Sequence, residues 1–75
     1  MRVRSQNENV REVNIVIRNL RRAMDITQSE LAEKMGVTRS TVAKWETGAN
    51  IPRGKMLIAL AEFFNVTVDE LIKEG

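Results

Sequence analysis

The stretch from Thr27 to Gly48 constrains the fold more than any other part of this 75-residue chain. It opens with the motif TQSE, which has the form of a capping box: the threonine and the glutamate each accept a hydrogen bond from the other's backbone N–H. A helix is therefore predicted to start here. Apolar residues recur at helical spacing up to Gly36, a residue type that ends helices because it tolerates positive φ. Thr38 then offers the N-cap of a second helix.

The second helix of this pair separates into two faces when it is projected at about 100° per residue. Val42 and Trp45 centre an apolar face, with Thr41 and Glu46 at its borders. The opposite face carries Arg39, Ser40, Ala43 and Lys44. This second face has hydrogen-bond donors, one small apolar residue and no acid, which is the chemistry that reads base edges in an acidic groove.

The joint pattern of the pair and its surroundings is similar to a known family. The residues that carry the similarity are Gln28, Ala32, Gly36, Val42, Trp45, Glu46, Gly48 and Pro52. Together they resemble the phage-repressor-like (Xre-type) helix-turn-helix family over about residues 17–72. The resemblance implies an all-α fold, a compact five-helix lambda-repressor-like DNA-binding domain with the helix-turn-helix at helices 2 and 3. It also implies that helix 3, Thr38 to Glu46, enters the major groove of double-stranded DNA.

Within that expectation the polar residues divide into two groups. Residues on the outward face of helix 3 are expected to contact bases: Arg39, Ser40, Ala43 and Lys44. Arg39 is the first candidate, because an arginine bonds bidentately to guanine O6 and N7. Residues at the margins are expected to contact phosphates: Gln28, Thr38, Thr41, Thr47, Arg53 and Lys55. Phosphate contacts position a protein and make its binding salt-dependent, but they do not choose sequence.

The resemblance further implies a mostly buried ion pair between Arg21 and Glu46. The helical projection places Glu46 toward the core side of helix 3, which agrees with that pairing. The alternative is that both residues are ordinary solvated charges.

Composition narrows the function classes. The chain has no cysteine and no histidine, so disulfides, thiol chemistry and the usual zinc sites are not expected. No residue cluster resembles a catalytic site, so we expect no enzyme activity, no metal and no cofactor. The net charge is only +2, but residues 1–24 carry six arginines against two glutamates, and residues 38–55 carry four basic residues against one acid. The positive charge therefore gathers on the first segment and on the predicted helix 3 with its flanks.

The flanking segments complete the expected domain organisation. Residues 1–10 are predicted to form a flexible N-terminal arm, and 11–75 the helix-turn-helix domain. The arm is interpreted either as a phosphate or minor-groove contact or as a frayed terminus or expression remnant. No apolar run approaches the length of a membrane span, so we expect a cytoplasmic protein.

The remaining helices follow from apolar spacing. A helix is predicted over about 12–24, with its stripe running from Val13 through Ile17 and Leu20 to Met24, although the β-branched run at 15–17 alone would favour a strand. Residues 47–54 are predicted as a loop. A fourth helix is expected over about 55–64, and a second capping-box motif, TVDE at 67–70, opens a short fifth helix.

The fourth helix presents two sets of apolar residues. Its inward stripe is predicted to be Leu57, Leu60, Ala61 and Phe64. A second set projects elsewhere and is a candidate dimer surface: Met56, Ala59 and Phe63. Burial against the last helix is the alternative for this second set.

Two functions are consistent with these observations. The first is a sequence-specific regulator of transcription, a repressor that binds a near-palindromic operator as a homodimer. The second is an antitoxin or adaptor whose main partner is another protein, such as a toxin or polymerase.

Overall fold

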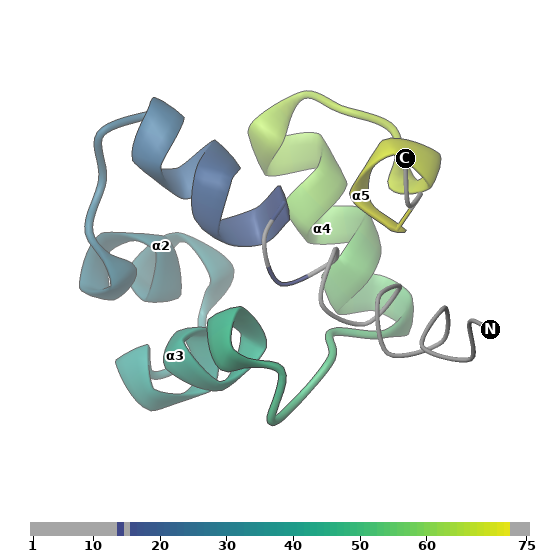
Figure 1. The fold of residues 1–75 in the computed structure, drawn as a ribbon. Helices are drawn as coiled ribbons and strands as arrows, with labels where there is room; N and C mark the ends of the chain where they lie inside the picture. Colours follow the sequence, from purple (N-terminus) through teal and green to yellow (C-terminus); the bar gives the residue numbers. More distant parts are fainter. Residues whose placement is uncertain (1–13, 15, 73–75) are drawn as a thin grey trace, which may run out of the picture.

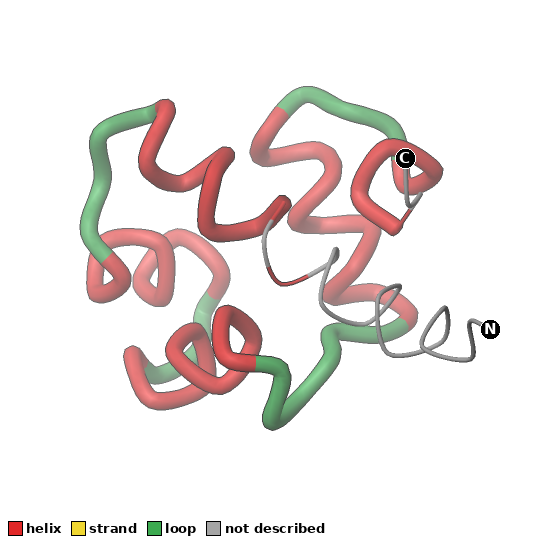
Figure 2. Tube along the Cα trace, in the orientation of Figure 1, coloured by secondary structure: helices red, strands yellow, loops and turns green. Residues whose placement is uncertain are grey.

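The structure is a computed structural model that describes residue 14 and residues 16–72. Within these residues the chain forms five helices and no strand (Figures 1 and 2). Asn14 and residues 16–23 belong to the first helix. It is followed by α2 (Gln28–Met35), α3 (Arg39–Thr47), α4 (Gly54–Phe64) and α5 (Val68–Ile72). The prediction of an all-α fold with five helices is confirmed.

Both predicted capping boxes are present. The Thr27 hydroxyl accepts from the Glu30 N–H at 3.0 Å, and the Glu30 carboxylate accepts from the Thr27 N–H at 2.7 Å. Thr67 and Glu70 repeat this arrangement at 3.0 and 2.9 Å before α5. Each box satisfies two N–H groups that a helix start leaves without an intrahelical partner, and so fixes where α2 and α5 begin.

The turn between α2 and α3 also matches the sequence prediction. Gly36 adopts φ 74° and ends α2, with its N–H donating to the last turn of that helix. Thr38 then caps α3, where its hydroxyl accepts from the Thr41 N–H at 3.2 Å. With only three residues between them, α2 and α3 form a helix-turn-helix.

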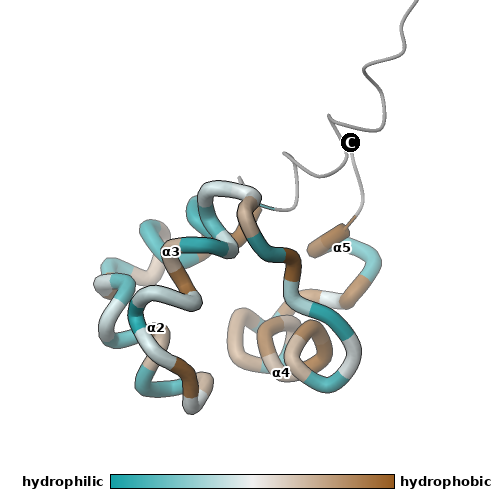
Figure 3. Tube along the Cα trace, turned by 90° about the horizontal axis from the view of Figure 1, so that it is seen from below, coloured by the Kyte–Doolittle hydropathy of each residue, from teal (hydrophilic) through white to brown (hydrophobic). Residues whose placement is uncertain are grey.

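The core is aliphatic and draws on every helix. Its buried members are Ile17, Leu31, Ala32, Val42, Trp45, Leu60, Ala61, Phe64 and Leu71. The most hydrophobic element is α4, whereas hydrophilic positions are frequent in α2 and α3 (Figure 3). Because α4 contacts both α2 and α5, it forms the support on which the helix-turn-helix rests.

The end of the first helix differs from the sequence prediction. The helix stops at residue 23, and Met24, predicted on the inward stripe, is 46% exposed. The reason is Asp25, which adopts the left-handed conformation with φ 59° and turns the chain away from the helix axis. Ile26 packs against the core from beyond that turn. The other end of this helix, including Val13, lies outside the described residues.

The premise for the candidate dimer surface on α4 is not met. Phe63 is half-buried, packs against the core and meets the ring of Phe64 edge-on at 5.1 Å. Met56 is also half-buried against the core, and Ala59 is half-buried. The exposed large apolar residue of α4 is instead Ile58, at 51%. For Met56 and Phe63, packing against the core therefore describes the structure better than outward projection.

The start of α4 agrees with the unusual sequence there. Arg53 is the N-cap residue and makes no side-chain cap hydrogen bond, and Gly54 begins the helix with φ 53°. The predicted N-terminal arm, residues 1–10, lies outside the described residues. Among the helices that the structure describes, none is both long enough and apolar enough to cross a bilayer.

Candidate nucleic-acid interface

The two faces of α3 differ sharply in burial. Val42 is fully buried and Trp45 is 3% exposed, so both pack into the core as the sequence predicts. The opposite face presents Arg39, Ser40 and Lys44 as exposed residues and Ala43 as half-buried. The core therefore fixes the rotation of α3 about its axis and directs these four residues outward.

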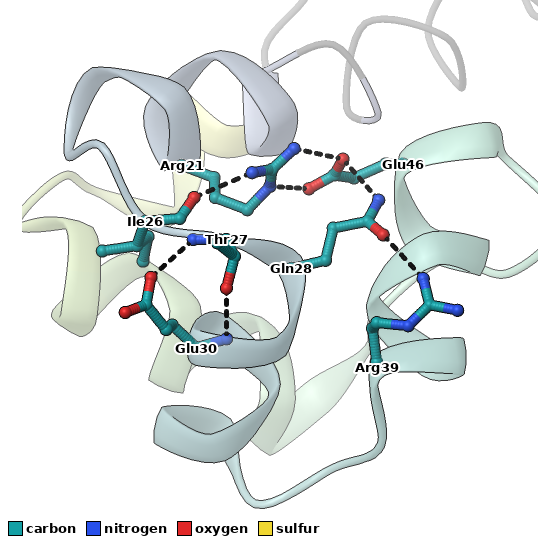
Figure 4. A network of polar contacts seen from close by, with 7 residues as sticks. All are labelled: Arg21, Ile26, Thr27, Gln28, Glu30, Arg39 and Glu46. Carbon is teal, nitrogen blue, oxygen red and sulfur yellow. Dashed lines mark hydrogen bonds and ion pairs between the residues drawn. The ribbon is translucent and has the colours of Figure 1, made fainter.

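The interior side of α3 is held by an ion pair. Arg21 of the first helix donates through Nε to Glu46 Oε2 at 2.6 Å and through Nη2 to Oε1 at 3.1 Å (Figure 4). The two side chains are only 12% and 3% exposed. The Arg21 Nη1 group also donates to the Ile26 carbonyl at 2.8 Å. The hydrogen bonds to Glu46 raise the pKa of Arg21 above its ordinary value, so the guanidinium stays charged.

Gln28 connects this ion pair to the outward face. Its Nε2 donates to Glu46 Oε1 at 3.1 Å, and its Oε1 accepts from Arg39 Nη1 at 3.2 Å (Figure 4). Because Glu46 is a strict acceptor and Arg39 a strict donor, their contacts fix which way the Gln28 amide points. The sequence analysis assigned Gln28 to a phosphate and did not anticipate this bridge, which becomes visible only when α2 and α3 are placed side by side.

The other predicted phosphate contacts lie around the two ends of α3. Thr38 and Thr41 share a hydrogen bond between their hydroxyls at 3.0 Å near its start. At its end the Thr47 hydroxyl donates to the Lys44 carbonyl at 3.3 Å. Arg53 and Lys55 follow at the start of α4, and both are exposed. Each of these five residues therefore keeps at least part of its polar group at the surface, although three of the hydroxyls also serve the local backbone or one another.

Asn14 was not singled out by the sequence analysis, yet it contacts the end of α3. It is 5% exposed. With its amide nitrogen facing the Trp45 carbonyl, it donates there at 2.6 Å and accepts from the Gly48 N–H at 3.2 Å. The available signal was spacing, since Asn14 lies three positions before Ile17 and therefore continues the buried stripe of the first helix.

Comparisons with known proteins agree with this geometry. The sequence model of the helix-turn-helix family matches residues 17–71. The HTH-type transcriptional activator BcrR of Enterococcus faecalis is 39% identical over 61 residues, which cover 81% of this chain and 30% of BcrR. The cryptic phage CTXphi transcriptional repressor RstR of Vibrio cholerae is 34% identical over 59 residues, covering 79% of this chain and 53% of RstR. This chain thus spans about half or less of the length of these relatives.

A solved structure shares the fold. It is the crystal structure of the P22 c2 repressor protein in complex with synthetic operator 9T in the presence of Tl+, with a TM-score of 0.77 and 30% sequence identity. The alignment covers 81% of this chain and 92% of the repressor chain. The lambda-repressor-like architecture expected from the sequence is therefore confirmed.

Proposed function

This chain belongs to the helix-turn-helix family, and from that premise we propose that it is a sequence-specific regulator of transcription that places α3 in the major groove of double-stranded DNA. The observation that carries the proposal is the outward face of α3, where Arg39, Ser40 and Lys44 are exposed while the opposite face is buried. A helix of this width fits the major groove, where each base pair presents a distinct pattern of donors and acceptors.

Arg39 is the residue that we propose contributes most to base discrimination. Its guanidinium matches guanine O6 and N7, and one such bidentate contact discriminates by about 1–3 kcal/mol. Gln28 supports it, because an acceptor at 3.2 Å restricts the rotamers of an otherwise exposed side chain. We therefore assign Gln28 to positioning Arg39 in addition to any phosphate contact. Ser40 and Lys44 extend the reading surface, and Ala43 is suited to contact a thymine methyl group.

The backbone contacts lie on either side of that surface. We propose that Thr38, Thr41, Thr47, Arg53 and Lys55 bind phosphates. The exposure of Arg53 and Lys55 beyond the end of α3 supports this assignment, because both carry positive charge to the flank of the groove. These contacts supply affinity for any duplex and its dependence on salt.

We further propose that the protein binds as a homodimer on a near-palindromic operator. One small domain contacts few base pairs, and two half-sites one helical turn apart supply the remaining specificity. Repression follows by occlusion when such a site overlaps a promoter. The names of the relatives reported above favour a regulator over the antitoxin or adaptor alternative and over an enzyme. A regulator of this kind works in the cytoplasm.

The test is selection from a random duplex library with the wild-type chain, followed by affinity measurements on the selected site and on random duplex. The Arg39→Ala variant is expected to lose at least about tenfold on the selected site, equivalent to about 1.4 kcal/mol, and much less on random duplex. The Arg22→Ala variant is the matched control, because it removes the same charge from an exposed position outside α3. Failure of the wild type to enrich any sequence would refute the proposal, and equal losses for Arg39→Ala on both duplexes would refute the role of Arg39.

A further inference from the structure

The first helix contacts α3 through polar side chains at two points. Asn14 and Arg21 lie seven positions apart, which is about two helical turns, so both face the same side. Ile17 lies between them and is fully buried. Arg21 contacts the side chain of Glu46, whereas Asn14 contacts the backbone at the end of α3. The two contacts therefore differ in kind and in what they fix.

The contact made by Asn14 meets a specific need of the α3 backbone. The last four carbonyls of a helix have no intrahelical partner, and the Trp45 carbonyl is one of them. The amide of Asn14 donates to that carbonyl, and it accepts from the Gly48 N–H, which also donates to the Lys44 carbonyl at 3.0 Å. Asn14 thus acts as a C-terminal cap supplied by another helix.

Gly48 is matched to this arrangement. A Cβ placed on Gly48 would lie 2.6 Å from the Asn14 amide, closer than real Cβ contacts permit. By contrast, a Cβ on Gly36 at the end of α2 would meet nothing within 4 Å. Gly48 is therefore needed both for its φ of 91° and for the close approach of Asn14.

We propose that Asn14 is a positioning residue for base recognition, which sets the placement of the C-terminal half of α3 and hence of Lys44 in the groove. This inference rests on the proposed function. Lys44 directly precedes Trp45, whose carbonyl Asn14 holds, so a shift of that backbone moves Lys44. Arg39 lies at the other end of α3, where Thr38 caps the helix and Gln28 holds the guanidinium. The two ends of the reading surface thus have separate supports.

The experiment compares base preferences at two positions of the selected site. Selections with Lys44→Ala and Arg39→Ala first identify the base pairs that each residue reads. The Asn14→Asp variant keeps the side-chain size but loses the donor to Trp45, and Asn14→Ala loses both contacts. We expect either variant to reduce preference at the Lys44 base pair by about tenfold, the size of one base contact. Preference at the Arg39 base pair stays within about twofold, as for independent sites.

A Gln28→Ala variant is expected to give the opposite pattern, with preference reduced at the Arg39 base pair alone. The control for stability is Ile17→Val, which weakens packing on the same helix face without touching either polar contact. All selections are done at a temperature at which circular dichroism shows each variant folded. If the Asn14 variants do not fold, Gly48→Ala displaces the amide from the other side and must reduce the Lys44 preference in the same way.

The inference is overturned if the deciding variants leave both preferences unchanged, as Ile17→Val does, or lower both equally, because Asn14 then serves stability alone. A wild-type chain that enriches no sequence would refute the proposed function itself. These two failures are distinguishable, since the first requires a wild-type site and the second denies it.

Discussion

Replacement of Glu46 by alanine tests the internal support of α3. The Glu46 carboxylate is 3% exposed and accepts three hydrogen bonds, two from Arg21 and one from Gln28. Without it, the Arg21 guanidinium keeps its bond to the Ile26 carbonyl but loses its counter-ion at a site where it is only 12% exposed. Removal of one partner from a buried pair costs about 3–5 kcal/mol, mainly because the other charge is left uncompensated.

That cost is large for a domain of this size. A single core in a chain of about 70–80 residues rarely supplies more than about 3–5 kcal/mol of net stability. Each kcal/mol lowers the melting temperature of such a domain by about 4–8 °C, so even a loss of 3 kcal/mol lowers it by about 12 °C or more. We therefore expect Glu46→Ala to be largely unfolded at 37 °C.

The assay is thermal and urea unfolding followed by far-ultraviolet circular dichroism. Glu62→Ala is the control, because it removes an exposed glutamate from α4 and is expected to change stability by no more than about 0.5 kcal/mol. The double variant Arg21→Met with Glu46→Leu removes both charges and is expected to be more stable than Glu46→Ala alone. A melting temperature for Glu46→Ala equal to that of wild type would refute this account of the ion pair.

Two further predictions concern the loop after α3 and the glycines that end the helices. Gly36→Ala is expected to cost about 1–2 kcal/mol from its left-handed backbone alone. Gly48→Ala is expected to cost more, because its Cβ also meets Asn14; equal costs in urea unfolding would contradict the close approach. Arg53→Ala and Lys55→Ala are each expected to weaken binding to selected and random duplex alike and to lower the slope of log affinity against log salt by about 0.9. An unchanged slope would remove that residue from the set of phosphate contacts.

Local signals in the sequence predicted most of the fold. The motifs at 27–30 and 67–70 fix helix starts through contacts three residues apart, so sequence spacing alone reveals them. Gly36 is predictable for the same reason, because few other residues adopt its φ of 74°. The burial of Val42 and Trp45 follows from helical periodicity.

Contacts between distant segments were harder to predict. The bridge from Gln28 to Glu46 and Arg39 requires the crossing of α2 and α3, and an amide that both donates and accepts gives no sign of its partners. Asn14 caps a helix more than 30 positions away, measured to the Trp45 carbonyl. The exposure of Met24 depends on the left-handed conformation of Asp25, which aspartate adopts only in some contexts.

The arrangement of side chains on α4 was also only partly predictable. Periodicity gave the buried Leu60 and Phe64 correctly. It could not decide between Phe63 and Ile58 for exposure, because that depends on where the neighbouring helices and loops lie. In the structure Phe63 packs against the core and Ile58 faces outward.

The central claim is that α3 reads base pairs from the major groove, and methylation interference on the selected duplex tests it most directly. Methylation at guanine N7 lies in the major groove, and methylation at adenine N3 lies in the minor groove. The account predicts that N7 methylation of guanines in each half-site blocks wild-type binding, and that Arg39→Ala loses this sensitivity at one of them. Interference confined to adenine N3 would contradict the account.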